Sequence, residues 1–441
     1  MTPTLIGLAM FGGMLLLMAV RVPIAAAMFI PGALGYWLMT NDIALLNQLK
    51  GSAVARLTVY DLSVIPLFLL MGQFATQGGL SRALFQAAAA FVGHIRGGLA
   101  MASVLAAAAF GAVCGSSVAT SATITQVAYP EMKSHGYHGR LSTATLAAGG
   151  TLGILIPPSV PLVVYGILTE QNIAKLFAAA MVPGLIAMLG YLGVVGFVAR
   201  RHPDLAPPSE PLAWSVRWRA LMGIWPIVLI FVIVFGGIYT GLFSPTEGAA
   251  VGAVGTFVAG LAQRELHLEG IRRSFVGTAE PSAMVFMIFL GADMINASLA
   301  LTAMPAAVAE WVGHLPVAPL VIVGAVLVLY IILGGVMDEL SMMLLTIPVI
   351  FPAIMQLPLL GLAPESKAIW FGILVLMTVS FGLIAPPVGL NVYVVNGIAK
   401  DVPMSETYKG VMPFLAWDLL RMLLLLLFPA LSLGLVGVLF K

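Results

Sequence analysis

The stretch GAVCGSSVATSATITQVAYPEM, residues 111–132, interrupts a very apolar chain with small and hydroxyl-bearing residues. It belongs to a run of 34 residues, from Gly97 to Pro130, that carries no charged side chain. About 20 helical residues are enough to cross the hydrocarbon core of a bilayer. The run is therefore too long for one crossing, and its centre is too polar for an ordinary one.

Composition identifies the medium in which the chain folds. Of its 441 residues, 61% are hydrophobic and only 9% are charged, against about 25% charged residues in soluble domains. Segments 5–20, 221–239 and 419–440 are long enough to span a bilayer. The chain lacks the alternating pattern of a membrane barrel, so we predict an all-α polytopic membrane protein. The N-terminus has no positive region and no cleavage site, so we predict a retained first helix.

Charge and cysteine content exclude other classes. The formal net charge is +2 and there is no polybasic tail, so we do not expect nucleic acid as a partner. The lipid bilayer is the expected partner. The single cysteine, Cys114, rules out an internal disulfide framework.

The positions of Lys and Arg indicate how the chain is threaded, because cytoplasmic loops collect positive charge. With the N-terminus outside, the predicted path places 15 of the 20 Lys and Arg residues on the cytoplasmic side. Both flanks of the uncharged run, Arg96 and Lys133, are then cytoplasmic. We therefore predict a re-entrant hairpin over about 97–130 with its tip near Gly115-Ser116-Ser117, preceded by a surface helix over 81–98.

Two similar halves make up the predicted organisation, residues 1–199 and 221–441, joined by a polar, Pro-rich cytoplasmic linker at 200–220. In the first half, a helix over 141–168 is interrupted by IPPS at 156–159. The second half is predicted to hold a hairpin within 316–364 and a broken helix over 368–396. The other predicted crossings are 22–40, 62–79, 182–199, 221–242, 246–263, 276–298 and 411–440.

An internal repeat supports this division. GILIPPSVPLVVYG (153–166) is echoed by GLIAPPVGLNVYVVNG (382–397), and AYPEM (128–132) by IFPAIM (350–355). Each half is predicted to cross the membrane an odd number of times, so the second half is inverted relative to the first. Inverted repeats with broken helices at matching positions indicate a secondary transporter with its site at the bilayer midplane.

Hairpin tips and helix breaks free polar backbone groups, which a membrane tolerates only against protein or a wet cavity. The hydroxyls of Ser117, Thr120 and Ser121 can satisfy those groups or bind a substrate, and Asn391 and Asn396 follow the second break. These five residues are the predicted substrate-binding set. The alternative is that the small residues only allow close helix packing.

The Pro-Pro pairs remove hydrogen-bond donors within a helix and free carbonyls one turn earlier. The repeat assigns these carbonyls to Thr151, Gly153 and Ile156, and to Ser380, Gly382 and Ala385. Unwound carbonyls suit a hard cation such as sodium, while a simple kink is the alternative. Asp338-Glu339 aligns with Ser116-Ser117 at an offset of 222 residues and predicts the second hairpin tip, unless it lies in an external loop.

Taken together, GAVCGSSVATSATITQVAYPEMKSHGY (111–137), GGTLGILIPPSVPLVVYG (149–166) and GLIAPPVGLNVYVVNGIA (382–399) resemble a known family. It is the large, DctM-like membrane subunit of TRAP transporters, the tripartite ATP-independent periplasmic systems of bacteria and archaea. The resemblance runs from the first helix to the last. It implies an elevator-type, sodium-coupled importer of organic acids in the cytoplasmic membrane, working with a small membrane subunit and a periplasmic substrate-binding protein.

Two sodium sites follow from the resemblance. Carried over by motif, one falls on Gly115, Ser116, Gly153, Ile156 and Pro158, and the other on Asp338, Ser380, Gly382 and Ala385. The family usually has Ser where this chain has Cys114, so a hydroxyl ligand there would be replaced by the Cys114 carbonyl or a neighbour. The moving part would comprise about 97–180 and 316–405.

Other functions remain as alternatives. The first is a stand-alone sodium/carboxylate symporter that needs no partner subunits, and the more distant ones are a channel or an intramembrane enzyme. The sequence has no His-Glu-x-x-His pair and no nucleotide-binding loop. We therefore expect coupling to an ion gradient, and no enzymatic activity.

Overall fold

The computed structural model describes residues 2–335 and 337–440, and these form helices joined by short connections with no β-strand among them. This confirms the predicted all-α fold. The first half contains α1 (Pro3–Ala19), α2 (Ile24–Met39), α3 (Asp42–Leu57), η1 (Tyr60–Ser63), α4 (Val64–Gln77), α5 (Leu80–Val92), α6 (Gly98–Cys114), α7 (Ser117–Ser134), α8 (Gly139–Leu155), α9 (Val160–Thr169) and α10 (Ile173–Arg201).

A short 3₁₀ turn, η2 (Pro203–Leu205), and a linker helix, α11 (Trp214–Gly223), connect the halves. The second half contains α12 (Trp225–Tyr239), α13 (Pro245–Ala262), α14 (Leu268–Leu301), α15 (Met304–Gly313), α16 (Pro319–Gly334), α17 (Glu339–Gln356), α18 (Pro364–Gly382), α19 (Leu390–Ile398), α20 (Met404–Leu427) and α21 (Ala430–Leu439). Among the described residues, six helices, or eight if two bent pairs each count as one, are long and apolar enough to cross a bilayer.

Several segments differ from the sequence-based expectation, among them α15 (Met304–Gly313), which was not predicted. Residues 42–57 form α3, which was not predicted; Asn41 caps it by accepting a hydrogen bond from the Ala44 amide at 2.9 Å. Helix α11 begins at Trp214, inside the predicted linker. The last crossing, predicted as one helix over 411–440, is two helices, because Pro429 follows the end of α20 and cannot donate to its last turn.

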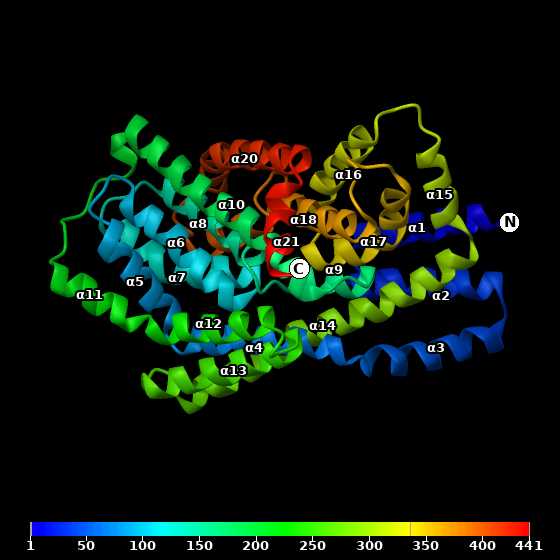
Figure 1. Ribbon diagram of the computed structural model, residues 1–441, viewed down its shortest axis with the longest axis horizontal. Helices are drawn as coiled ribbons and strands as arrows, with labels where there is room; N and C mark the ends of the chain where they lie inside the picture. The colour runs from blue at the N-terminus through cyan, green and yellow to red at the C-terminus, as the bar shows by residue number, and fades with distance from the viewer. Residues whose placement is uncertain (1, 336, 441) are drawn as a thin grey trace.

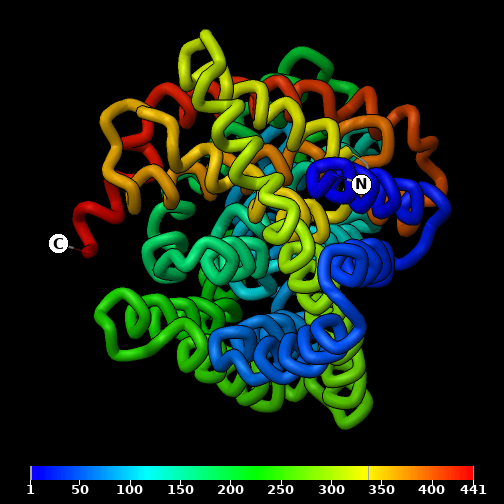
Figure 2. Tube along the Cα trace, turned by 90° about the vertical axis from the view of Figure 1, so that its right-hand side faces the viewer, coloured from blue at the N-terminus to red at the C-terminus, as the bar shows by residue number. Residues whose placement is uncertain are grey.

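The helices form two layers that can be followed in two views. In Figures 1 and 2, α3, α4, α12, α13 and α14 lie along the lower side of the molecule. Helices α6–α10 and α16–α20 lie above them. Figure 1 also shows α6 and α7 in one half of the upper layer and α16 and α17 in the other half. The two hairpins therefore enter the bundle from opposite ends.

The order of elements recurs between the halves. Each of α6 to α10 has its counterpart in α16 to α20, and α7 and α17 begin 222 residues apart, at Ser117 and Glu339. The short helices α9 and α19 both follow a Pro-Pro pair whose internal peptide bond is cis. Packing is exchanged between the halves, since α9 contacts α17 and α19 contacts α7. Each hairpin thus contacts the broken helix of the other half as well as that of its own half.

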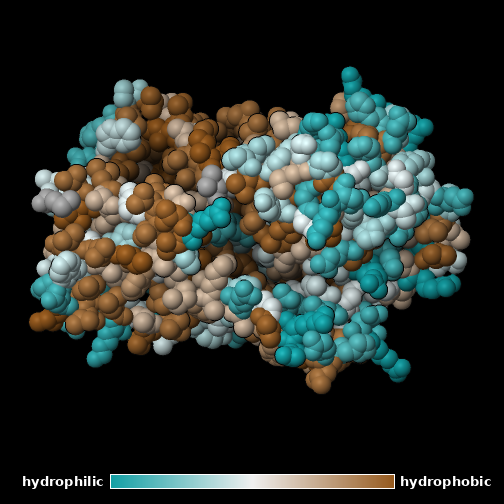
Figure 3. All heavy atoms as spheres, turned by 180° about the vertical axis from the view of Figure 1, so that it is seen from behind, coloured by the Kyte–Doolittle hydropathy of each residue, from teal (hydrophilic) through white to brown (hydrophobic). Residues whose placement is uncertain are grey.

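Charged and polar side chains gather at one end of the molecule. Figure 3 shows them concentrated at its right-hand end, which is the end that carries α11 in Figure 1. The opposite half of this face is mostly apolar. The linker therefore lies at the polar end of the molecule.

The lower layer is held by close helix crossings. A Cβ added to Gly32 on α2 would lie 2.7 Å from the backbone nitrogen of Ile295 on α14. We expect Gly32→Ala to destabilise the protein by about 1–3 kcal/mol, because the obstacle is backbone that cannot rotate away. The measurement is the thermal unfolding midpoint of the detergent-purified protein. The matched control is Gly13→Ala, whose Cβ would come no closer than 4.0 Å to another atom; equal midpoints would contradict the expectation.

Candidate functional site

The first hairpin turns between Cys114 and Ser117. Gly115 has φ +65°, a left-handed conformation that favours glycine. Ser116 caps α7, since its hydroxyl accepts a 3.4 Å hydrogen bond from the amide of Ala119. The Thr120 hydroxyl donates to the Ser116 carbonyl at 2.7 Å. The tip therefore presents several oxygen atoms inside the protein.

The first broken helix meets this tip. The amide of Val160 donates to the Gly115 carbonyl at 3.2 Å. A Cβ on Gly153 would lie 2.7 Å from the Ser116 carbonyl oxygen, and one on Gly115 would lie 3.0 Å from the Pro158 carbonyl oxygen. Four residues predicted for the first sodium site, Gly115, Ser116, Gly153 and Pro158, are thus brought together.

Ile156 and Cys114 flank this cluster. The extended backbone of Ile156 ends α8, and its side chain packs toward Gly184 on α10. The buried Cys114 lies against Gly72 of α4, where an added Cβ would be 3.1 Å from the Cys114 sulfur. Helix α8 stays regular to Leu155, so Thr151 lies inside it rather than at the break.

The second hairpin tip is built on Asp338, which caps α17. Its carboxylate accepts hydrogen bonds from the amides of Leu340 at 3.2 Å and Ser341 at 3.1 Å, and from the Ser341 hydroxyl. Asp338 therefore occupies the place that Ser116 has in α7. One carboxylate oxygen of the adjacent Glu339 is buried without a hydrogen-bond partner among the described residues.

The second broken helix crosses this hairpin at glycine. A Cβ on Gly382 would lie 2.6 Å from the carbonyl carbon of Gly334. Ala385 donates its amide to the Phe381 carbonyl, and the Ala385 carbonyl lies 3.1 Å from where a Cβ of Gly389 would be. The Ser380 hydroxyl is buried and donates to the Leu376 carbonyl at 2.7 Å. Gly382 is thus placed beside the hairpin, whereas the Ser380 side chain bonds within its own helix.

A direct contact joins the two halves of the site. The Asn391 amide, at the start of α19, donates to the Ser117 hydroxyl at 2.7 Å and to the Ala147 carbonyl at 3.2 Å. Asn391 and Ser117 are both 0% exposed. The backbone amide of Asn391 also donates to the Leu383 carbonyl at 2.9 Å. The second helix break is therefore tied to the first hairpin tip inside the protein.

The remaining predicted substrate residues are not all part of this contact. Thr120 points to the Ser116 carbonyl, and the Ser121 hydroxyl is buried beside Gly150 with no hydrogen-bond partner among the described residues. Asn396 donates to the Val402 carbonyl at 2.9 Å, where it supports the loop that leads into α20. Its side chain therefore lies with that loop rather than with Ser117.

Hydrogen bonds from the base of the first hairpin to the loop between α19 and α20 were not predicted. Lys133 and Tyr129 on α7 each donate a 2.7 Å hydrogen bond to the carboxylate of Asp401, between α19 and α20. The hydrogen bond from Lys133 lowers the pKa of Asp401 most, and the hydrogen bond from Tyr129 lowers it further. The sequence signal was weak, because a lone Lys and a lone Asp 268 positions apart do not suggest a pair.

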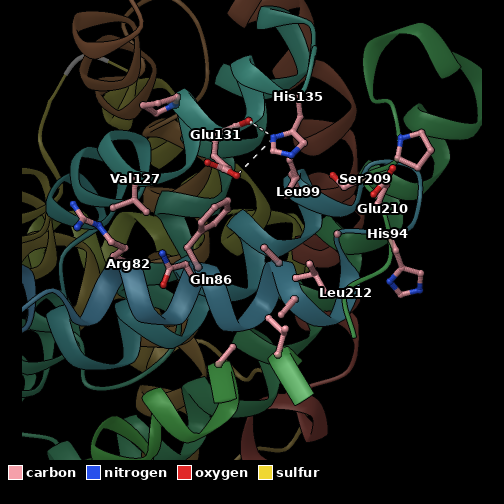
Figure 4. A pocket seen from close by; sticks show the side chains of 18 of the residues that line it. Arg82, Gln86, His94, Leu99, Val127, Glu131, His135, Ser209, Glu210 and Leu212 are labelled. Atoms are coloured by element: carbon pink, nitrogen blue, oxygen red, sulfur yellow. Dashed lines mark hydrogen bonds and ion pairs between the residues drawn. The ribbon is translucent and has the colours of Figure 1, made fainter. Parts of the chain in front are cut away.

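A cavity of about 1010 Å³, lined by both charged and apolar side chains, opens at the same end of the molecule (Figure 4). Its walls come from α5, α7, the linker and α11. The labelled side chains of Arg82, Glu131 and His135 line it, and His135 lies 3.7 Å from the Glu131 carboxylate. His94 and His135 also line this cavity at the base of the hairpin.

The atoms at the two tips that could bind a cation are chiefly carbonyl and hydroxyl oxygens. The second tip adds the Asp338 carboxylate. Such oxygens are the ligands that hard cations prefer. Among the described residues, no group of three or more His, Cys, Asp or Glu side chains could hold a metal. The residues at the tips fit a weakly bound alkali cation such as sodium better than a transition metal.

Two hairpins that meet two broken helices inside an all-α membrane bundle define a secondary transporter rather than an enzyme. Residues 11–431 match the family model described as the DctM component of the tripartite ATP-independent periplasmic transporter. The chain belongs to this family of TRAP transporter large permeases, as its sequence motifs indicated.

Relatives support the assignment over nearly the whole chain. The C4-dicarboxylate TRAP transporter large permease protein DctM of Pseudomonas aeruginosa is 37% identical over 85% of this chain and 86% of its own length. The protein of the same name from Rhodobacter capsulatus is 32% identical over 98% and 99%. The Alcanivorax borkumensis YdaH transporter shares the fold, with a TM-score of 0.62 and 18% identity over 89% of this chain and 90% of that one.

Proposed function

We propose that this permease carries out sodium-coupled uptake of a small organic acid, delivered by a periplasmic substrate-binding protein, through an elevator movement in the bacterial or archaeal cytoplasmic membrane. The observation that carries the proposal is the hydrogen bond from Asn391 to Ser117 at 2.7 Å. It joins the second broken helix to the first hairpin tip, and this is the arrangement in which a midplane site is built from both repeats.

Sodium binding is supported by the two tip regions. In the first, the carbonyls of Ser116 and Pro158 converge beside Gly115 and Gly153. In the second, the carboxylate of Asp338 and the carbonyls near Gly382 and Ala385 would contribute. A cation at either place would replace the hydrogen-bond partners that the broken helices lack.

The helix N-termini near the tips and breaks support an organic acid as the substrate class. Helices α7, α9, α17 and α19 all begin at a tip or a break. Helix N-termini carry partial positive charge and attract carboxylates. The names of the two relatives above specify C4-dicarboxylates, so a four-carbon dicarboxylate is the first substrate to test.

The elevator movement is supported by the two layers. The upper layer holds both hairpins and both broken helices, in residues 97–180 and 316–405, and would move as the transport part. The lower layer would stay fixed as the scaffold. The opposite entry of the two hairpins supports inverted repeats. The cavity between α7, α5 and α11 would provide a route to the cytoplasm.

The proposal that a partner subunit binds rests on the outer face of the lower layer. Helix α12 exposes large apolar side chains, among them Val228, Val232 and Ile233, and α13 exposes Val254 and Val258. A small membrane subunit that packs there would widen the fixed scaffold, and lipid would cover the rest.

We expect reconstituted vesicles to take up a four-carbon dicarboxylate only when this chain, the small subunit and the loaded binding protein are combined with an inward sodium gradient. Replacing sodium by choline should reduce the initial rate at least about tenfold, because charge and coordination at the tips would be lost. The measurement is uptake of radiolabelled substrate with each component omitted in turn. Undiminished uptake driven by a proton gradient alone would contradict sodium coupling.

The second candidate function is a stand-alone sodium/carboxylate symporter. The likeness to the YdaH transporter concerns the fold alone. The same vesicles distinguish the two functions, because full-rate uptake of free substrate by this chain without partners would support the stand-alone symporter.

A further inference from the structure

A network of buried polar side chains lies inside the upper layer, away from the two tips. Asp418 and Arg421 on α20 are 1% and 0% exposed, and their carboxylate and guanidinium atoms lie 2.9 Å apart. The segment that carries them is long and apolar enough to span a membrane. Charged residues in such segments are costly to bury and are by default candidates for a functional role.

The network extends from α20 through α10 to α8. The Tyr191 hydroxyl donates to the Asp418 carboxylate at 2.8 Å, and the Thr151 hydroxyl lies 3.1 Å from the Tyr191 hydroxyl. Thr151 also donates to the Ala148 carbonyl at 2.7 Å. Tyr191 gives its single hydroxyl proton to the carboxylate, so its oxygen can only accept from Thr151. Thr151 also has a single proton, which it shares between the Tyr191 oxygen at 3.1 Å and the Ala148 carbonyl at 2.7 Å.

This network reaches the residues at the first tip. Thr151 is two residues before Gly153, which faces the Ser116 carbonyl, and the last turn of α8 ends with Ile156 donating to the Leu152 carbonyl. Helices α10 and α20 cross very closely beside it, since a Cβ on Gly190 would lie 1.8 Å from the Trp417 ring. This close crossing fixes the distance between Tyr191 on α10 and the charge pair on α20.

The repeat gives the network a position in both halves. Val160 and Leu390 begin the short helices α9 and α19, and the same sequence offset relates Tyr191 to Arg421. The sequence offset between Gly153 and Gly382 relates Thr151 to Ser380. In the first half, Tyr191 and Thr151 are joined by hydroxyls, and the charge pair on α20 anchors them.

We propose that Tyr191, Asp418 and Arg421 are positioning residues that fix the broken end of α8 and thereby set the affinity of the first sodium site. Asp418 holds the Tyr191 hydroxyl in one orientation, and the Arg421 guanidinium lies 2.9 Å from the Asp418 carboxylate. Tyr191 in turn holds Thr151, so that the carbonyls after it face the hairpin tip. The inference rests on the proposed sodium coupling, and none of the three residues touches the ion itself.

Replacement of a buried ion pair by apolar residues of similar size is often tolerated by the fold, whereas removal of one partner is not. The test variants are therefore Tyr191→Phe and the double replacement Asp418→Leu with Arg421→Met. The matched control is Trp370→Phe, which removes a buried 2.9 Å hydrogen bond from α18 to the Leu425 carbonyl of α20 but leaves α8 untouched.

The experiment measures sodium-dependent thermal stabilisation of the purified permease and sodium-dependent uptake in the full reconstituted system. We expect both test variants to raise the half-saturating sodium concentration about tenfold, which corresponds to about 1.4 kcal/mol, with maximal uptake changed less than about twofold. Trp370→Phe should lower the unfolding midpoint without moving the sodium dependence. Sodium dependence equal to that of the wild type in both test variants would overturn the inference.

Hydrogen exchange separates this inference from the proposed function. In Tyr191→Phe, the amides of residues 151–156 should exchange faster than in Trp370→Phe, whether or not sodium is present. A wild type without any sodium response would remove the proposed coupling, while faster exchange would still support positioning of α8. Unchanged exchange at 151–156 would overturn the positioning role itself.

Discussion

Asn391→Ala should reduce uptake by the complete system at least about a hundredfold. The Asn391 amide is fully buried and donates to Ser117 at the first hairpin tip and to Ala147 on α8. Its removal leaves the Ser117 hydroxyl and a carbonyl without their donor, and each unsatisfied buried group costs about 1–3 kcal/mol. Two such groups account for a factor of this size. The measurement is the initial uptake rate at saturating sodium.

A loss of folding must be separated from a loss of transport in this variant. Co-purification of the small subunit, which we propose binds the lower layer, should be retained in this variant. The control is Asn296→Ala, which alters a half-buried amide on α14, away from both tips. Asn391→Ala with uptake within about twofold of the wild type would show that the contact between the halves is not needed for transport.

Addition of one methyl group at Gly153 or Gly382 should abolish sodium-dependent uptake, again by about a hundredfold or more. A Cβ on Gly153 would lie 2.4 Å from the Thr120 hydroxyl oxygen and 2.7 Å from the Ser116 carbonyl oxygen. A Cβ on Gly382 would lie 2.6–2.8 Å from three backbone atoms of Gly334. The carbon would occupy the space between helix break and hairpin tip, so the carbonyls could no longer surround a cation.

Glycines with free space provide the matched controls for this prediction. A Cβ on Gly397, in α19, or on Gly324, in α16, has no atom within 4 Å. Gly397→Ala and Gly324→Ala should therefore keep uptake within about twofold of the wild type, since alanine is also favoured in helices. Uptake by Gly153→Ala and Gly382→Ala at the level of these controls would contradict the proposed sodium sites.

The hairpins and broken helices were predictable because their signals are local. A run of 34 uncharged residues with Gly and Ser at its centre cannot form one ordinary crossing. A Pro-Pro pair breaks a helix at its own position, whatever surrounds it. The structure puts the first tip at Gly115 and Ser116 and the breaks at both Pro-Pro pairs. The second tip, marked only by alignment of Asp338 with Ser116, depended on the repeat.

Other features were missed because their signals are not local. Helix α3 is moderately polar, and it bends by 59° into the η1–α4 segment that follows. Its position depends on Arg56, which forms an ion pair with Asp293 on α14 and lies over the ring of Phe289. The threading rule treats Arg56 as an external charge, because it counts charges and cannot recognise a partner 237 residues away.

The sequence by itself determined the medium, the helical class, the two breaks and the family, because hydrophobic length, proline chemistry and short motifs act within a few residues. Only the tertiary structure decided which break meets which tip. The exchange of α9 and α19 between the halves, the hydrogen bond from Asn391 to Ser117 and the buried pair of Asp418 and Arg421 all join distant residues. Such contacts depend on how helices cross at glycine, where backbones approach within the reach of one methyl group, and the order of residues along the chain does not specify these crossings.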